Sequence, residues 1–441
     1  MLILKNRSWF LKKVSIPADL LTSTRCVHHK FHLEQPNYDT DYLLNPTNAP
    51  QIEANIEHRK GVGNIHLVHQ LSNRLKSLPS GNDSERNRLN NQLQEELRKI
   101  PNKTHPDVLA HGTQPKVVRY YNDKPNFEGR KVFEFSEMAK KLNVFRMEKL
   151  GNFTGHKSYY LTGDLVELEQ ALIQYAVTKL IANKFKLITV PDILPARIIE
   201  SCGMNTHGER NQVYKLNNPH ETLCLSGTSE MALAGYFAGT ITDEDQLPLK
   251  LTAVSRCFRA ETSALQEEKG IYRVHQFTKV EMFSVCRPDQ SEAILEEFRD
   301  IEVGLFDALG LHFQLLDMPA CELGAPAYRK YDIEAWMPGR SMYGEISSCS
   351  DCSDFQARRL GIRYRSKTDN ERLDYAHTVN GTACAIPRML IALLENFQNP
   401  DYTITIPEPL RPFMRGKERI SRKKLLPELK LTKRLAQEEI C

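Results

Sequence analysis

Arginine, aromatic and carboxylate side chains recur in three segments of the second half of the chain. The first is RCFRAE at 256–261, and after a short polar loop the chain continues as YRVHQFTKVE at 272–281. The third, NGTACAIPR at 380–388, is expected to be a polar turn that leads into an apolar helix. Arginine suits phosphates because its planar guanidinium donates paired hydrogen bonds and stays charged. The three segments predict a site that binds a nucleoside triphosphate and activates a small acid.

Alternation along a strand would gather these side chains on one surface. In 273–285, Arg273, Phe277 and Glu281 share a face, and on the preceding strand Arg259 and Glu261 share one. A hairpin can bring the two rows side by side, and an arginine opposite an aromatic ring can sandwich a purine. A salt-bridged hairpin around a core phenylalanine would have the same pattern, so this hairpin alone leaves both interpretations open.

Hydrophobic periodicity predicts the elements that would position this hairpin. The expected apolar helices cover 164–184, 292–309 and 384–397. The expected strands cover 186–190, 249–259, 273–285, 312–317 and 342–349. Because these strands are closely spaced or joined by hairpins, the pattern favours an α+β fold, with an antiparallel sheet of about six or seven strands flanked by helices. Neither G-x-x-x-x-G-K-[ST] nor G-x-G-x-x-G occurs, so side chains would have to bind the phosphates.

Two helices with leucine stripes are expected ahead of this sheet. The first covers 64–78, and its stripe is Leu67, Leu71, Leu75 and Leu78. The second begins near Asp83 or Ser84, and its stripe is Leu89, Leu93, Leu97 and Ile100. A tight loop between them predicts a short antiparallel helical arm. Residues 101–130, rich in Pro, Asn, Lys and Gly, are expected to be a linker.

Charge is distributed unevenly over the 441 residues. The formal net charge is +4, but residues 1–33 carry +5, residues 411–441 carry +6, and the part between them is acidic. Basic ends on an acidic body suit a polyanionic partner. The first 34 residues mix apolar and basic side chains with few acids, as in a mitochondrial presequence. No segment has about 18 consecutive apolar residues, so no membrane span is expected.

The cysteines do not form a secreted-type pattern. The chain has 10 of them at scattered positions, which is typical of free thiols in a reducing compartment. Cys349 and Cys352 form a C-x-x-C, but no second C-x-x-C or H-x-x-x-H supplies the other half of a structural zinc site. We therefore expect no zinc.

The segments together resemble one enzyme family. Residues 258–261 followed by 270–277 resemble motif 2 of the class II aminoacyl-tRNA synthetases, 380–396 resemble motif 3, and 164–191 resemble motif 1, with Pro191 as its proline. Thr228-Ser229-Glu230 and the stretch 345–359 are similar to seryl-tRNA synthetases, closest to the mitochondrial type. The resemblance covers about residues 40–420. It implies ATP-dependent formation of seryl-adenylate and transfer of serine to tRNA(Ser).

The resemblance also implies residue roles. Arg259, Glu281 and Arg388 would be catalytic. The implied ATP-binding residues are Arg259, Glu261, Arg273, Val274, Phe277, Glu345, Ser348 and Arg388. The implied serine-binding residues are Thr228, Glu230, Arg259, Glu281, Asn380 and Thr382. Phe277 would stack on adenine, Arg259 would hold the α-phosphate and the serine carboxylate, and Arg388 would bind the γ-phosphate.

Glu345 and Ser348 would hold the magnesium ion of the ATP complex. A regular strand would place residues three apart on opposite faces, so both can reach one metal only if a bulge or strand end lies near Ser347.

The resemblance further implies partners and domains. We expect a presequence at 1–34, a tRNA-binding arm at 35–113, a catalytic domain at 114–410 and a basic tail at 411–441, in a mitochondrial matrix enzyme. Motif 1 implies a dimer, either of identical chains or with a synthetase-like paralogue. The arm is shorter than in bacterial family members, and the loop at 262–269 carries Glu267 and Glu268 where those members usually have arginines. The basic tail is therefore a further candidate for tRNA contact.

Three other interpretations compete with this one. A non-catalytic paralogue should have lost Arg259, Glu281, Arg388 or Glu345, and all four are present. A class II synthetase for threonine or proline would need a different pocket, with zinc ligands in the case of threonine. A plain RNA-binding scaffold would leave the clustered carboxylates and arginines unexplained.

Overall fold

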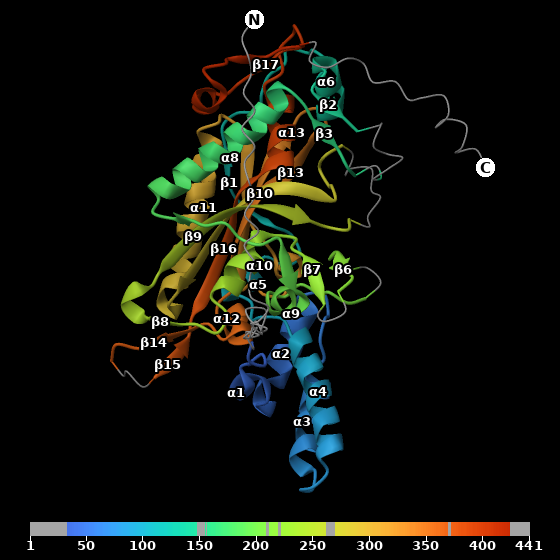
Figure 1. The fold of residues 1–441 in the computed structure, drawn as a ribbon, viewed down its shortest axis with the longest axis vertical. Helices are drawn as coiled ribbons and strands as arrows, with labels where there is room; N and C mark the ends of the chain where they lie inside the picture. The colour runs from blue at the N-terminus through green and yellow to red at the C-terminus, as the bar shows by residue number, and fades with distance from the viewer. Residues whose placement is uncertain are drawn as a thin grey trace, which may run out of the picture. The chain divides into compact units, whose positions relative to one another are not determined.

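A mixed eight-stranded sheet forms the centre of the computed structural model, which describes residues 33–147, 155, 157–208, 211–218, 222–261, 270–368 and 372–423. Its strands in spatial order are β1 (Lys116–Tyr121), β11 (Phe313–Asp317), β12 (Arg329–Met337), β13 (Met342–Asp351), β16 (His377–Ala385), β10 (Gln276–Cys286), β9 (Leu249–Phe258) and β4 (Lys186–Leu187). All neighbours are antiparallel except β4, which runs parallel to β9. The α+β prediction is confirmed, with eight strands in place of six or seven (Figure 1).

Helices cover one face of this sheet and enclose its apolar core. They are α6 (Phe135–Leu142), α8 (Asp164–Ala182), α11 (Ser291–Asp307) and α13 (Ile386–Asn396). Val280 and Met282 of β10 and Ile333 of β12 are fully buried in the same core as these helices. Strand alternation therefore sends the even-numbered residues of β10 into the core and leaves its odd-numbered residues on the other face.

Shorter elements lie around the opposite face and the sheet ends. The helices among them are α9 (Ala196–Ser201), α10 (Ser229–Tyr236) and α12 (Phe355–Leu360), with the 3-10 helices η4 (Glu244–Gln246), η6 (Pro288–Gln290) and η7 (Ala320–Glu322). The small sheets are β5 (Ile193–Pro195), β7 (Leu223–Leu225) and β6 (Lys215–Leu216); β15 (Leu373–Tyr375), β14 (Arg363–Arg365) and β8 (Ile241–Asp243); and β2 (Phe145–Arg146) with β3 (Tyr160–Leu161). Phe237, the C-cap of α10, stacks 6.4 Å from Phe283 of β10 on this opposite face.

The helical arm is present and has a larger core than the sequence indicates. It consists of α3 (Ile65–Ser77) and α4 (Asp83–Lys99), which run side by side in Figure 1, with α1 (Thr40–Leu43), η2 (Pro46–Asn48) and α2 (Ala49–His58). The α4 stripe of Leu89, Leu93 and Leu97 is buried as predicted. On α3 the buried side is Ile65, Val68 and Leu71, whereas Leu67 and Leu75 are only partly buried. The α3 stripe was misplaced because α2 also packs on this helix.

The predicted linker at 101–130 is wrong. This segment contains α5 (Pro106–Leu109) and the edge strand β1. Most β1 side chains are exposed, and its valines and tyrosines do not alternate with polar residues, so the segment lacks the periodicity of a half-buried strand although it pairs with β11. Just before it, the Asn102 Nδ2 donates to the carbonyls of Pro326 and Cys352, at 2.8 and 3.0 Å. These contacts tie the arm to the part of the chain that contains the large sheet.

The first part of the expected basic tail is folded. Residues 411–423 follow β17 (Ile404–Thr405) and include the end of η8 (Glu408–Met414) and β18 (Arg419–Ile420), where Met414 and Ile420 are buried. Lys417 and Lys423 both pair with Asp164 at the start of α8, at 2.7 and 3.1 Å. The expected presequence, apart from its last residues, and the rest of the tail, 424–441, lie outside the described residues. Among the described helices, none has the length and apolarity needed to cross a membrane.

Candidate functional site

The predicted phosphate- and purine-binding residues lie where two central strands end. β9 and β10 pair antiparallel up to Phe258 and Gln276. Phe277 and Lys279 of β10 line a cavity, while Val280 and Met282 enter the helical core. The alternation predicted for this segment is therefore confirmed within β10.

Arg259, Glu261 and Arg273 lie beyond the last strand pair, not within the strands as predicted. The backbone N–H of Arg259 donates to the His275 carbonyl at 3.0 Å and closes the hairpin there. The Arg273 Nη1 lies 3.7 Å from the Glu261 Oε2. The Arg259 guanidinium carbon lies 5.3 Å from the centre of the Phe277 ring. Charge and ring thus meet outside the regular ladder.

A cavity of about 160 Å³ joins these residues to those of β13 and α13. All eight residues predicted to bind ATP line it: Arg259, Glu261, Arg273, Val274, Phe277, Glu345, Ser348 and Arg388. They come from segments up to 129 positions apart in the chain (259 to 388), so the fold and not local sequence brings them together.

Arg388 and Glu345 form the charged wall of this cavity. The Arg388 Nη1 lies 3.1 Å from the Glu345 Oε2 and also donates to the Glu345 carbonyl at 2.9 Å. Burial opposes ionisation of Glu345, but the attraction of Arg388 and Lys330 outweighs it and lowers the pKa to about 2. Glu345 is therefore an ionised carboxylate at any working pH.

A bulge brings Glu345 and Ser348 to one side. Ile333 and Glu334 are adjacent on β12, yet they pair with Ser347 and Glu345 of β13, so Ile346 is the extra residue. The bulge shifts the alternation by one position, and both Glu345 and Ser348 line the cavity. The predicted irregularity is confirmed, one residue before the expected position.

A second cluster of carboxylates adjoins the cavity. Glu230 Oε1 accepts hydrogen bonds from the Asn380 Nδ2 at 2.9 Å and from the Gln356 Nε2 at 2.6 Å. Burial, together with the negative charge of Glu281, raises the pKa of Glu230 to about 7. Glu230 thus changes charge near neutral pH.

Glu281 is the deeper of the two carboxylates and is only 1% exposed. It accepts a hydrogen bond from the Thr228 Oγ1 at 3.1 Å and contacts the Lys279 ammonium. Burial raises its pKa, and Lys279 opposes that shift. The Lys279 Nζ also lies 3.4 Å from the Thr382 Oγ1, which lines the cavity. Because the Glu230 N–H also donates to the Thr228 Oγ1 at 3.3 Å, the residues predicted to bind serine, apart from Arg259, form one connected network beside the predicted ATP site.

The sequence of this chain is similar to those of known proteins. Residues 214–397 match the model of the tRNA synthetase class II core domain (G, H, P, S and T). Over 73% of the chain, the sequence is 42% identical to a serine–tRNA ligase of Treponema denticola, of which the match covers 76%. The chain belongs to the seryl-tRNA synthetase family. Over 76% of the chain it is also 45% identical to the mitochondrial serine–tRNA ligase of Mus musculus, of which the match spans 64% of the length.

Solved structures agree. The seryl-tRNA synthetase of Pyrococcus horikoshii, determined with ATP, superposes with a TM-score of 0.78 at 28% identity and covers 88% of this chain and 100% of its own. The cytoplasmic serine–tRNA ligase of Naegleria fowleri, determined with AMP, gives the same TM-score at 25% identity over 89% of this chain. The described residues therefore have the fold of the seryl-tRNA synthetases, a mixed sheet flanked by helices.

Three residues of this candidate site were not predicted from the sequence. Lys279 stands in the same row as Phe277 and Glu281, so strand alternation was a usable signal. Tyr272 lies 4.5 Å from the Arg388 guanidinium carbon, and its hydroxyl accepts from the Glu345 N–H at 3.1 Å. Gln356 is fully buried and orients Glu230. No hydrophobic periodicity in the sequence indicates that this glutamine would be part of the site.

The region expected to be a polar turn is instead strand β16, in the middle of the sheet. Asn380 and Thr382 lie on it, and Thr378 and Gly381 are buried between neighbouring strands. The polar residues are accommodated because β10 and β13 satisfy the backbone on both sides. Cys349 and Cys352 are both buried, and the described residues contain no cluster of three or more potential His, Cys, Asp or Glu metal ligands.

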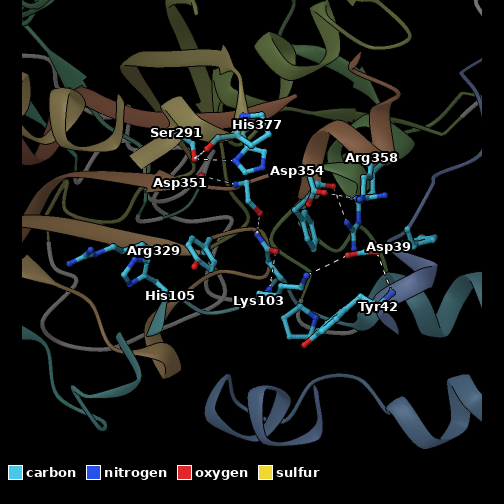
Figure 2. Close-up of a pocket in the computed structure, with 18 of the residues that line it drawn as sticks. Asp39, Tyr42, Lys103, His105, Ser291, Arg329, Asp351, Asp354, Arg358 and His377 are labelled. Carbon is cyan, nitrogen blue, oxygen red and sulfur yellow. Dashed lines mark hydrogen bonds and ion pairs between the residues drawn. The ribbon is translucent and has the colours of Figure 1, made fainter. Parts of the chain in front are cut away.

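A larger cavity, of about 430 Å³, lies at the opposite end of β13 and β16, near the base of the arm (Figure 2). Its charged groups neutralise one another: Arg358 pairs with Asp354 at 2.6 Å, and Lys103 lies 3.4 Å from Asp39. The smaller cavity, with its arginines directed at one space, is the better candidate for a polyanionic ligand.

Proposed function

We propose that this chain is an ATP-dependent serine–tRNA ligase, which forms seryl-adenylate and transfers serine to tRNA(Ser). The observation that carries the proposal is the position of Arg259 between the two clusters. Its guanidinium lies over the Phe277 ring, and its Nε lies 3.4 Å from the Gly227 carbonyl, next to Thr228. A fixed cation here can contact the α-phosphate of ATP and the carboxylate of serine at the same time.

The first reaction needs positioning more than a protein nucleophile. A serine carboxylate oxygen attacks the α-phosphorus, the bond to the β-phosphate oxygen breaks, and pyrophosphate leaves. Arg259 would neutralise charge at the α-phosphate, Phe277 would stack on adenine, and Arg388 would bind the γ-phosphate with Arg273 nearby. Alignment of the two reactants is the main contribution, because it replaces a bimolecular encounter. The ribose hydroxyl at the end of the tRNA then attacks the adenylate carbonyl, and AMP leaves.

Glu345 and Ser348 fit a magnesium ion. One carboxylate is ionised, and one hydroxyl faces the same cavity. Magnesium binds few protein oxygens and completes its shell with phosphates and water. When bound, it would neutralise charge on the triphosphate. Arg388 would then give up its ion pair with the Glu345 carboxylate and bind a phosphate instead.

Glu230, Glu281 and Thr228 would recognise the ammonium and hydroxyl of serine, and Asn380 and Thr382 would close the pocket. Alanine and glycine would leave these buried groups without a partner. A site of this kind rejects an analogue that lacks the hydroxyl by ~10⁴-fold. Threonine would have to be excluded by size.

The partners and compartment follow from the same proposal. We propose that the arm within 35–113 and the basic tail contact tRNA(Ser). We also propose that this chain acts in the mitochondrial matrix, because the mouse and bovine relatives are named as mitochondrial enzymes. A dimer through motif 1 is supported by exposed apolar side chains at Ile181, Leu187 and Ile193, which are each about half exposed.

Serine-dependent exchange of pyrophosphate into ATP tests the proposal, with threonine, alanine and glycine as controls and Arg259→Ala beside the wild type. Exchange with serine alone, lost in the variant, is the expected result. A folded protein that exchanges with no amino acid would instead be a non-catalytic paralogue.

A further inference from the structure

The two stems of the hairpin that carry Arg259, Glu261 and Arg273 are not held by strand pairing alone. The ladder of β9 and β10 ends at Phe258 and Gln276, and one further backbone bond joins Arg259 to His275. Among the described residues, Gln212 and Lys157, from other parts of the chain, also form hydrogen bonds with the backbone of these stems.

Lys157 contacts both stems at once. Its ammonium donates to the Glu261 carbonyl at 2.7 Å, and its own carbonyl accepts from the His275 N–H at 3.2 Å. The residue is only 6% exposed, although lysine is among the residues least often buried. A buried ammonium that donates to a backbone carbonyl forms a short, charge-assisted hydrogen bond that fixes the carbonyl in place.

Glu261 needs such support because its backbone is strained. Its φ is +43°, in the left-handed region that non-glycine residues rarely adopt. Strained residues persist only where their surroundings hold them. Gln212 provides the other half of the restraint: its side-chain oxygen accepts from the Glu261 N–H at 2.9 Å, and its carbonyl accepts from the Ala260 N–H at 2.8 Å.

The restrained residues are those that face the cavity. Glu261 pairs with Arg273 at 3.7 Å, and both line the cavity with Arg259. Rotation of the Glu261 peptide would move this carboxylate and its arginine partner together. By contrast, hydrogen bonds from Gln356, Asn380 and Thr228 hold the Glu230 and Glu281 carboxylates.

We infer that Lys157 is a positioning residue for ATP: it fixes both stems of the hairpin so that Glu261 and its partner Arg273 meet the nucleotide in a productive geometry. The inference rests on the proposed function, since it assigns these two residues to ATP and not to serine. It predicts a specific pattern of effects, in which nucleotide binding and turnover depend on Lys157 while recognition of serine does not.

The test compares Lys157→Met, Lys157→Arg and the exposed-surface control Lys367→Met in the full chain. Serine-dependent ATP–pyrophosphate exchange gives kcat and the KM for each substrate, calorimetry with ATP gives the nucleotide Kd, and thermal melting gives stability. Displacement of a reacting group by about 1 Å lowers rates by ~10²-fold. We expect Lys157→Met to lower kcat by about that factor and to raise the ATP Kd, with the serine KM within about threefold of wild type. Lys157→Arg should restore most of the activity, because a guanidinium can donate to the same carbonyl.

Wild-type kcat and ATP Kd in Lys157→Met would overturn the inference. So would equal losses for ATP and serine, or activity lost only in proportion to folded protein, because each is the result of a structural role alone. The two hypotheses fail differently. Absence of exchange in the wild type would refute the proposed function, while calorimetry with ATP would still compare wild type and variant directly.

Discussion

Gln356→Leu is the sharpest test of how the carboxylate pocket selects its ligand. The substitution keeps the size of a fully buried side chain but removes the donor that lies 2.6 Å from the Glu230 Oε1. A hydrogen bond to a charged group contributes about 1.5–3 kcal/mol. Because Asn380 still donates at 2.9 Å, we take the lower end, about 1.5 kcal/mol, which is about tenfold in affinity.

The assay is serine-dependent ATP–pyrophosphate exchange at saturating ATP. We expect the KM for serine to rise about tenfold and the KM for ATP to stay unchanged. The pH dependence should also move: the Gln356 hydrogen bond lowers the pKa of Glu230, so its loss raises that pKa further above 7. Serine binding should then require a higher pH than in the wild type.

Gln314→Leu is the matched control, because Gln314 donates to another carboxylate, Glu334, at 2.8 Å. Both variants lose a glutamine–glutamate hydrogen bond, and Gln356→Leu also leaves the Thr378 hydroxyl without its acceptor. Both should therefore have lower melting temperatures. If Gln356→Leu retained the wild-type KM for serine while melting earlier, Gln356 would only support the fold, and the proposed role of Glu230 would lose its main structural support.

Three further predictions concern metal, stability and assembly. Glu345→Gln should raise the magnesium concentration for half-maximal exchange about tenfold or more, because it removes the ionised ligand; an unchanged magnesium titration would contradict this. Arg59→Met should lower the free energy of unfolding by about 3 kcal/mol in denaturant titrations, because the buried Arg59 donates to the carbonyls of Asn102 and Ala327 at 3.2 and 2.8 Å; equal stability would refute that role. Ile181→Glu should weaken the proposed dimer about 100-fold in sedimentation experiments without unfolding it, and a persistent dimer would place the interface elsewhere.

The parts of this fold that the sequence predicts are those where one physical pattern dominates. β10 is buried on its core side, so its alternation alone predicts correctly that Phe277 and Glu281 lie on the opposite face. The bulge, expected near Ser347 and found at Ile346, followed from the family resemblance, which requires Glu345 and Ser348 to reach one metal ion. In each case local geometry determines which way a side chain points.

The missed features depend on contacts that no local pattern encodes. β1 pairs with β11 through its backbone, and its apolar residues do not alternate with polar ones, so they gave no strand periodicity. The buried side of α3 differs from the predicted one because α2 covers a side of this helix that would be exposed to solvent in an arm of only two helices. Gln356 and Lys157 act through tertiary hydrogen bonds at sequence separations of 126 and 104 residues. Sequence patterns indicate which residues can do chemistry, whereas the residues that hold them in place emerge only from the assembled structure.

The two carboxylate sites should respond differently to pH. Arg388 and Lys330 keep Glu345 ionised with a pKa of about 2, whereas burial and the neighbouring Glu281 raise the pKa of Glu230 to about 7. A raised pKa means that Glu230 is mostly neutral below pH 7 and gains its charge as the pH rises through 7. The ammonium of serine favours the ionised form, so binding below pH 7 requires loss of a proton.

The KM for serine should therefore fall about tenfold between pH 6 and pH 8, since the ionised fraction of a group with pKa 7 rises by about that factor. The KM for ATP should change less over the same range, because Glu345, the carboxylate proposed to lie beside the triphosphate, has its pKa lowered to about 2 and stays ionised. Exchange kinetics at four pH values with each substrate varied would measure both. A serine KM that is flat with pH would refute the prediction that Glu230 gains its charge near pH 7 and binds the serine ammonium in the ionised form.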